Sequence, residues 1–397
     1  MADFEGEVGT NFYAFVKTKV LPLPLLDELE LGQVVAPPPL IDIDEMILFT
    51  VGTENTGFSD IYAMAVGADD AINLTNHNYD DFAAAWSATA GKIAFISCRD
   101  TPVEPGENDE LDYYCRHDAV SIYMMNPDGS EQQFLASYQA GFNDPVGYLQ
   151  PVWSPDGSML VYWDNNSLSI DQDGYKSTEE PYYPYIIEIN NPQSRRIEHN
   201  LLSIATSDAP SWSPDSNQIA VIGSDDQSVD NIFLIDIDDG SIQNLTGDFT
   251  DEYLIQSNAQ WSPDGETLIF NCRYDATGYI CAIDHEGDSI TLLGEGIRAS
   301  WSHDGMKIAY FGLENYSAVS IRVMDADGSN DTAIWSASDA AYAPDVGQGL
   351  HWSADDSHLA FIKYANPNRV FVIDADGNNE TDLYENGPGG SDPVWIP

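Results

Sequence analysis

Basic residues are scarce in this sequence, with 14 Lys and Arg against 66 Asp and Glu among 397 residues, a formal net charge of −52. Nucleic acids and anionic lipid surfaces are bound mainly through Lys and Arg, so the composition excludes nucleic acid as a partner and electrostatic attachment to membranes. The charge instead favours cations and basic partners. The alternative is that the negative charge keeps the protein soluble in a saline or calcium-containing environment outside the cell, where charges are screened.

Long apolar runs are also absent. No segment reaches the roughly 18 to 20 apolar residues that a membrane helix needs, so no direct membrane span is expected. The opening residues "MADFEGEVGT" lack the basic and apolar regions of a secretion signal, which fits a cytosolic protein or one whose signal or anchor is absent from this chain.

Motifs of catalysis are missing too. There is no G-x-S-x-G elbow, no G-x-G-x-x-G and no Walker loop. The seven histidines are scattered, whereas a metal-dependent lyase needs several ligands that converge. We therefore predict no catalytic residue, and the metal content stays unknown.

The four cysteines form two close pairs in the sequence, Cys98 with Cys115 and Cys272 with Cys281. Neither pair has C-x-x-C spacing and no histidine cluster accompanies them, which argues against zinc. Two local disulfides are predicted, and they would place the protein in an oxidising compartment. Four unconnected thiols in a cytosolic protein are the alternative.

A tryptophan phrase recurs along the chain. It reads "WSPDGSMLVYW" from Trp153 and "WSPDGETLIFN" from Trp261, and related phrases begin at Trp86, Trp212, Trp301 and Trp352. The spacing is near 45 residues with insertions. Each phrase predicts a strand, a tight Pro-Asp-Gly turn and an apolar strand. A second hairpin with an Asp-Gly turn follows, as in "NIFLIDIDDGSIQNLT", so one unit is four antiparallel strands, the pattern of a propeller blade.

The two ends of the chain each carry part of one more unit. Residues 46–75 match the last three strands without a tryptophan strand before them, and "DPVWIP" at the end matches the first strand alone. We therefore predict an all-β fold: a seven-bladed β-propeller of four-stranded antiparallel blades over residues 46–397. Pairing of the C-terminal strand around Trp395 with the N-terminal blade would close it, which leaves no unpaired edge.

This phrase resembles the repeat of TolB-type β-propellers, found in the TolB protein of the bacterial Tol system and in prolyl-oligopeptidase-like propellers. The resemblance covers Met46 to Trp395 and implies a fold. TolB itself resembles a six-bladed propeller behind an α/β domain, whereas about 45 residues precede the repeats here, so a Tol role is not implied.

The insertions between strands all fall on one face of the predicted propeller, and long loops on a rigid scaffold commonly carry binding. These loops combine acids with tyrosines, which are common at interfaces. The candidate binding residues on this loop face are Tyr113, Tyr114, Tyr182, Tyr183 and Tyr253. The alternative is that these rings pack only their own loops.

The first strand of each unit should line the central channel. Three residues before a tryptophan stand Gln150, Asn258, Arg298 and Asp392, and directly before another stands His351. These five polar residues are the candidate site at the channel mouth for a small molecule or an ion; simple hydration is the alternative. No cofactor is expected. "DADGSND" from Asp325 lacks the spacing of an EF-hand and reads as a hairpin turn, with weak surface calcium as the alternative.

Residues 1–45 do not match the repeat and mix leucines with prolines, as in "APPPL". They are expected to form an extended segment that is either a tether or a docking strand. Taken together, the residues predict a non-enzymatic extracytoplasmic scaffold, in the periplasm or at the cell surface, that binds a protein partner or cell-surface complex, or a glycan. The alternative is a lyase or hydrolase acting on glycans with a cation in the channel.

Overall fold

A computed structural model divides the chain into two units, residues 1–42 and residues 43–397. The structure describes parts of the second unit, and everything below concerns them. They are residues 46–52, 58–100, 120–138, 150–164, 182–199, 201, 203–205, 208–224, 229–249, 253–314, 317–337, 344–347, 349–364, 367–385 and 387–396.

The described residues are all-β, as predicted, apart from one short 3-10 turn at Gly247–Phe249. Among them no helix has the length and apolar character to cross a bilayer.

Most strands belong to four-stranded antiparallel sheets. The first sheet along the chain contains β1 (Met46–Gly52), β2 (Ser59–Ala65) and β3 (Ile72–Asn73), with β28 (Ser391–Ile396) at its other edge. The next contains β4 (Asp81–Ser87), β5 (Lys92–Ser97), β6 (Val120–Met125) and β7 (Gln133–Tyr138). A third contains β8 (Val152–Trp153), β9 (Met159–Asp164), β10 (Tyr183–Glu188) and β11 (Asn191–Arg196). The last contains β24 (His351–Trp352), β25 (His358–Lys363), β26 (Arg369–Asp374) and β27 (Thr381–Asp382).

Two sheets depart from four strands. One has an interrupted first strand, and it contains β12 (Ser203–Ile204), β13 (Ser211–Trp212), β14 (Gln218–Ser224), β15 (Asp230–Asp236) and β16 (Ile242–Asn244). The other has seven strands: β17 (Leu254–Trp261), β18 (Thr267–Tyr274), β19 (Thr277–Asp284), β20 (Ile290–Trp301), β21 (Lys307–Glu314), β22 (Ser317–Asp325) and β23 (Thr332–Ser336). Strand β20 is both the last strand of one repeat and the first of the next. The tryptophans Trp261 and Trp301 are the closest pair in the repeat series, so no residues remain for a separate connection.

The C-terminal strand pairs with the N-terminal sheet, as the sequence predicted. Ile47 lies opposite Trp395 and Leu48 opposite Val394 in the antiparallel β1–β28 ladder. The edge of β1 is therefore covered, which removes a template for strand addition.

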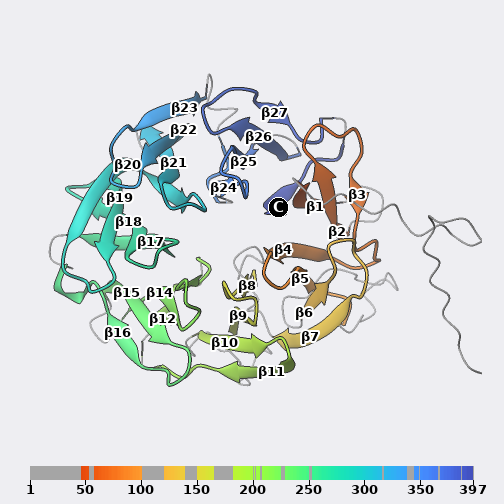
Figure 1. Cartoon of the computed structure of the whole chain (residues 1–397), viewed down its shortest axis with the longest axis horizontal. Coiled ribbons are helices and arrows are strands. Elements are labelled where there is room, and N and C mark those ends of the chain that lie inside the picture. Colours follow the sequence, from red (N-terminus) through yellow and green to blue (C-terminus); the bar gives the residue numbers. More distant parts are fainter. Residues whose placement is uncertain are drawn as a thin grey trace, which may run out of the picture. The chain divides into compact units, whose positions relative to one another are not determined.

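Figure 1 shows the sheets following one another around a centre, with β8, β17 and β24 toward the inside and β11, β16 and β23 at the periphery. Apolar clusters fill the space between neighbouring sheets. One of them joins Ile47 and Trp395 to Ile362 and Val372 of the β24–β27 sheet. Neighbouring sheets cover both faces of each sheet, so the second strand of each repeat is a continuous apolar run. Phe95 of β5, for example, is fully buried.

Candidate functional site

A cavity of about 490 Å³ lies among the first strands of the sheets. All five polar residues predicted for the channel mouth line it: Gln150, Asn258, Arg298, His351 and Asp392. They come from segments far apart in the sequence, so the repeat brings them together. Asp208, Ser211 and Gln260 add further polar groups.

Asp208 and Gly347, which lie in connections that precede first strands, line this cavity, and so does Pro155 of a tight turn. A second cavity, of about 510 Å³, is lined by turn residues such as Thr89 and Pro155. The two cavities share Trp153, Pro155, Ser300, His351 and Val394, and among the five predicted residues His351 lines both.

A backbone irregularity recurs three residues before the repeat tryptophans. Asn258, Arg298 and Asp392 have φ values of 62°, 55° and 52°, and Ala83 and Gly349 share the left-handed conformation. The strand register shifts at this point, for example between Ile297 and Ser300. A bulge of this kind re-aims a side chain. For residues other than glycine it costs on the order of 1–2 kcal/mol each, so the surrounding sheet must hold it in place.

Arg298 is fixed by a carboxylate that sequence reasoning missed. Its Nη1 lies 2.5 Å from Oδ1 of Asp208, and both side chains are largely buried. The second oxygen, Oδ2, accepts a hydrogen bond from the backbone N–H of Asn258 at 3.0 Å. The backbone N–H of Arg298 donates to Asn271 Oδ1. The guanidinium of Arg298 thus lines the cavity with its charge balanced by Asp208 and its position fixed by these hydrogen bonds.

The amide side chains form hydrogen bonds within one first strand and between neighbouring first strands. Asn258 Nδ2 donates to the carbonyl oxygen of Ala299 at 2.8 Å, and Gln260 Nε2 donates to Asn258 Oδ1 at 3.0 Å. Gln150 Nε2 donates to the carbonyl oxygen of Ala84 at 2.5 Å. These groups therefore brace the cavity wall as well as line it.

Asp392 is the carboxyl of the cavity with a perturbed proton affinity. Desolvation raises its pKa above the ordinary value, the charge of Asp345 raises it further, and the Ser391 hydroxyl and the charge of His351 oppose the rise. Ser391 Oγ donates to Asp392 Oδ2 at 3.0 Å. A carboxyl that keeps its proton to higher pH can donate as well as accept hydrogen bonds.

The structure describes three of the five loop-face tyrosines. Tyr183 lies between two partners, the His199 ring stacked at 4.4 Å and the Arg196 guanidinium at 4.4 Å. The carbonyl oxygen of Tyr182 accepts a hydrogen bond from His199 Nε2 at 2.8 Å. Tyr253 stacks on Tyr274 at 5.3 Å. Tyr183 and Tyr253 thus pack against their own surroundings, and Tyr113 and Tyr114 lie outside the described residues.

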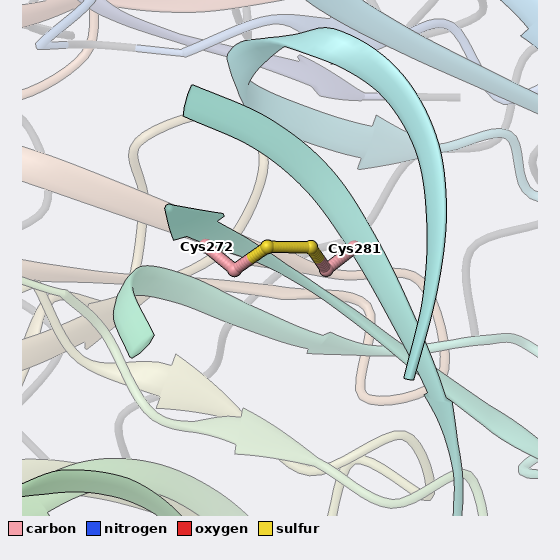
Figure 2. The surroundings of a disulfide bond; sticks show 2 residues. All are labelled: Cys272 and Cys281. Atoms are coloured by element: carbon pink, nitrogen blue, oxygen red, sulfur yellow. A yellow bond between two sulfur atoms is a disulfide. The ribbon is translucent and has the colours of Figure 1, made fainter. Parts of the chain in front are cut away.

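The second predicted cysteine pair forms a disulfide. Cys272 in β18 and Cys281 in β19 are bonded and fully buried (Figure 2). Cys98 is also disulfide-bonded, while Cys115 lies outside the described residues.

Metal ligands do not gather in the described part of the chain, where no group of three or more His, Cys, Asp and Glu side chains is arranged to hold an ion.

A family model described as the TolB beta propeller domain matches residues 114–397. The chain belongs to this family. The TolB-like propeller is thus shown by the family match as well as by the antiparallel sheets.

Similar solved structures include proteins of different activity. TolB from Acinetobacter baumannii is 14% identical with a TM-score of 0.52, over 89% of this chain and 67% of that chain. An oligogalacturonate lyase from Vibrio parahaemolyticus is 12% identical with a TM-score of 0.60, over 82% and 85%. A puromycin hydrolase is 13% identical with a TM-score of 0.59, over 88% and 53%. At these identities the likeness extends to the fold alone.

One curated relative matches part of the TolB-like chain. The uncharacterized peptidase YuxL of Bacillus subtilis (strain 168) is 23% identical over 193 residues, which are 48% of this chain and 22% of that protein. The chain therefore spans about a fifth of this relative's length.

Proposed function

We propose that this TolB-like protein is a seven-bladed closed propeller that binds a partner at its loop face without catalysing a reaction. The convergence of Gln150, Asn258, Arg298, His351 and Asp392 on one cavity is the observation that carries the proposal. Polar groups converging in a concave site are the usual form of a binding site.

Closure is supported by the shared first sheet. Strand β28 pairs with β1 and also contacts β4 and β24, the first strands of the two neighbouring sheets. Counting β20 in two units, and β12 with β13 as one interrupted strand, gives seven four-stranded units, one of which combines both chain ends; this count supports the proposed seven blades.

The partner is proposed to be a protein or a cell-surface complex, with a glycan as a further candidate. A neutral polar segment of this partner would enter the cavity and form hydrogen bonds with its amide side chains. A neutral segment is proposed because the charges of Arg298 and Asp208 already balance each other. Around the cavity the strong negative charge would attract basic groups of the same partner. Residues 1–45 are proposed as a tether or a second docking element.

We place the protein outside the cytoplasm. The Cys272–Cys281 disulfide supports this location because disulfides persist in oxidising compartments. No cofactor is proposed, and surface-bound calcium is kept as a proposal for the acidic turns.

The test is affinity capture from the organism that makes the protein, with the Gln150→Trp variant, which fills the cavity mouth, beside the wild type. Thr89→Trp on the turn side is the matched control. We expect Gln150→Trp to lose a partner that wild type and Thr89→Trp both retain. Equal recovery by all three proteins would contradict binding at the cavity. A form lacking residues 1–45 tests the docking role of that segment separately.

An enzyme is the second candidate, because Asp392 has a raised pKa and faces the charge of His351 in the same cavity. Such a carboxyl fits a general acid, and a glycan lyase or hydrolase with a cation is the proposed class. Incubation with polygalacturonate and Ca²⁺ or Mn²⁺ tests it by the appearance of unsaturated or reducing ends. Turnover that Asp392→Asn abolishes would establish the enzyme and overturn the scaffold.

A further inference from the structure

A third hollow, of about 660 Å³, lies away from the central cavity on strands β20 to β23. Its wall contains small residues, Gly312, Ser320, Ala333, Ser336 and Ala337. Side chains with hydrogen-bonding groups complete it: Glu295, Tyr310, Arg322 and Asp331. The site shares no residue with the cavity described above.

The repeat shows what the hollow lacks. Gly312 lies eleven residues after Trp301, and the equivalent residue after Trp352 is Lys363. Lys363 fills the matching space of the β24–β27 sheet, where its Nζ lies 4.0 Å from the centre of the Phe371 ring and forms an ion pair with Glu380. In the sheet with the hollow, this side chain is absent, and the Ser320 hydroxyl and the Arg322 side chain occupy the space next to Gly312.

A second side chain is missing from the neighbouring strand. Trp335 covers Lys363 from β23, with 4.7 Å between Nζ and the ring centre. Trp335 pairs with Ile321, and in the preceding repeat Gly294 of β20 pairs with Ile280, the residue equivalent to Ile321. Gly294 is therefore the equivalent of Trp335. Two glycines thus stand where the adjacent repeat has a tryptophan and a lysine. A Cβ atom on Gly294 would lie 2.8 Å from the Tyr310 hydroxyl, so the glycine makes room for that group.

The polar groups of the hollow are held in fixed positions. Arg322 donates from Nη2 to Asp331 Oδ2 at 2.7 Å and from Nε to the Tyr310 hydroxyl at 3.2 Å. Desolvation and the neighbouring Asp331 raise the pKa of Tyr310 to about 12. Ser320 is 7% exposed, and its hydroxyl lies beside these groups.

We propose that this hollow is a binding site for a neutral polyhydroxylated ligand of one or two pyranose rings, a sugar or a sugar-like polyol. Carboxylates of Asp331 and Glu295 accept hydrogen bonds, while Arg322 and Tyr310 carry donors, and a hydroxyl can pair with either kind. The volume falls within the range of small-molecule sites.

Charge selects against other ligand classes at this site. An anion meets two carboxylates and the strong negative charge of the whole chain. A cation meets the Arg322 guanidinium, which already has its carboxylate partner. A neutral ligand with many hydroxyls incurs neither penalty.

The repeat also provides the variant that tests this site. Ala333 pairs with Arg322, and Phe134 pairs with Tyr123 at the equivalent place in another repeat. That repeat accommodates the Phe134 side chain, which is 46% exposed. Ala333→Phe should therefore fold and fill the hollow. Thr332→Phe is the matched control, since Thr332 is the preceding, also exposed residue of β23 and its side chain faces the other side of the sheet.

Saturation-transfer NMR with the full chain tests the proposal, using neutral methyl hexopyranosides as probes beside galacturonate and lysine. We expect transfer to at least one neutral probe, at least tenfold weaker transfer with Ala333→Phe, and unchanged transfer with Thr332→Phe. Thermal unfolding confirms that both variants are folded. Absence of transfer to every neutral probe, stronger transfer to a charged probe, or equal transfer with Ala333→Phe would overturn the proposal.

Discussion

The indole Nε1 of Trp395 donates a hydrogen bond to the carbonyl oxygen of His351 at 2.9 Å. The same relation joins Trp352 to Ser300 and Trp153 to Ala85, in each case the residue before the preceding repeat tryptophan. Trp86, Trp261 and Trp301 are different, because their Nε1 atoms are buried without a partner in the part of the chain that the structure describes. Trp153, Trp212, Trp352 and Trp395 therefore each pack between the sheets and also form a hydrogen bond to the neighbouring first strand.

Replacing Trp395 by Phe should lower the free energy of unfolding by about 2 kcal/mol. The substitution deletes a hydrogen bond, leaves the His351 carbonyl without this donor and removes some buried area. Trp86→Phe is the control and should cost less, since it also removes an unsatisfied buried N–H. Urea denaturation of both variants measures the difference. A larger loss for Trp86→Phe would contradict this account of the tryptophan.

The hairpin between β18 and β19 has two central residues in the left-handed conformation, Asp275 at φ 45° and Ala276 at φ 66°. Two-residue turns of this kind favour glycine. Ala276→Gly should therefore stabilise the protein by roughly 0.5–1 kcal/mol. Ala282→Gly, in the middle of β19, should destabilise it by a similar amount. Thermal unfolding of the two variants gives opposite shifts if the turn has this conformation.

Acid should weaken the tryptophan-phrase turns. Hydrogen bonds from Ser357 and Ser353 lower the pKa of Asp355 to about 2. The ordinary value in an unfolded chain is about 3.9. Between these values the unfolded chain binds more protons, so the contribution of Asp355 to stability is present above about pH 4 and is lost as the pH falls toward 2.

Ser357→Ala should lower the free energy of unfolding at pH 7 by about 0.5–1 kcal/mol, since it removes the largest of these hydrogen bonds. The gap between the variant and the wild type should narrow below pH 4 in urea denaturation experiments. A gap that stays constant from pH 7 to pH 2 would show that Asp355 is not the group involved.

Salt should stabilise the protein, because 66 acidic residues repel one another with only 14 Lys and Arg to offset them. The Debye length falls from about 30 Å at 0.01 M ionic strength to about 3 Å at 1 M. The melting temperature should rise across this range in sodium chloride. A flat response would mean that the charges are too well separated to matter.

The sequence predicted the strands well because the tryptophan phrase marks each first strand and its turn. The predicted pairing of Trp395 with the sheet around Ile47 is present. The merging of two units through β20 was not predicted. The merging requires that the chain makes no turn between Gly294 and Arg298. From the sequence alone, the glycines in this stretch suggest that the strand ends there.

For the cavity, counting back from each tryptophan was enough to find Arg298, Asn258 and Asp392. Asp208 was missed because it lies one residue earlier in its repeat. A signal existed: the equivalent positions hold Phe82, Leu149, Ser257, Ile297, Gln348 and Ser391, and Asp208 is the charged member. The left-handed backbone of Arg298 could not be foreseen, since glycine occupies that column at Gly349 only.

The hollow near Tyr310 could not be predicted from single residues. It depends on a comparison of Gly312 with Lys363 and of Gly294 with Trp335, and the second equivalence follows only from the strand register.

The meeting of the two chain ends in one sheet is the claim on which the cavity and the loop face depend. Thr50 and Ser391 lie opposite each other in the β1–β28 ladder. In a Thr50→Cys, Ser391→Cys double variant, we predict a new disulfide on mild oxidation, identified by peptide mapping, with a raised melting temperature. Two cysteines that remain free thiols under the same conditions, in a protein that is still folded, would contradict the account.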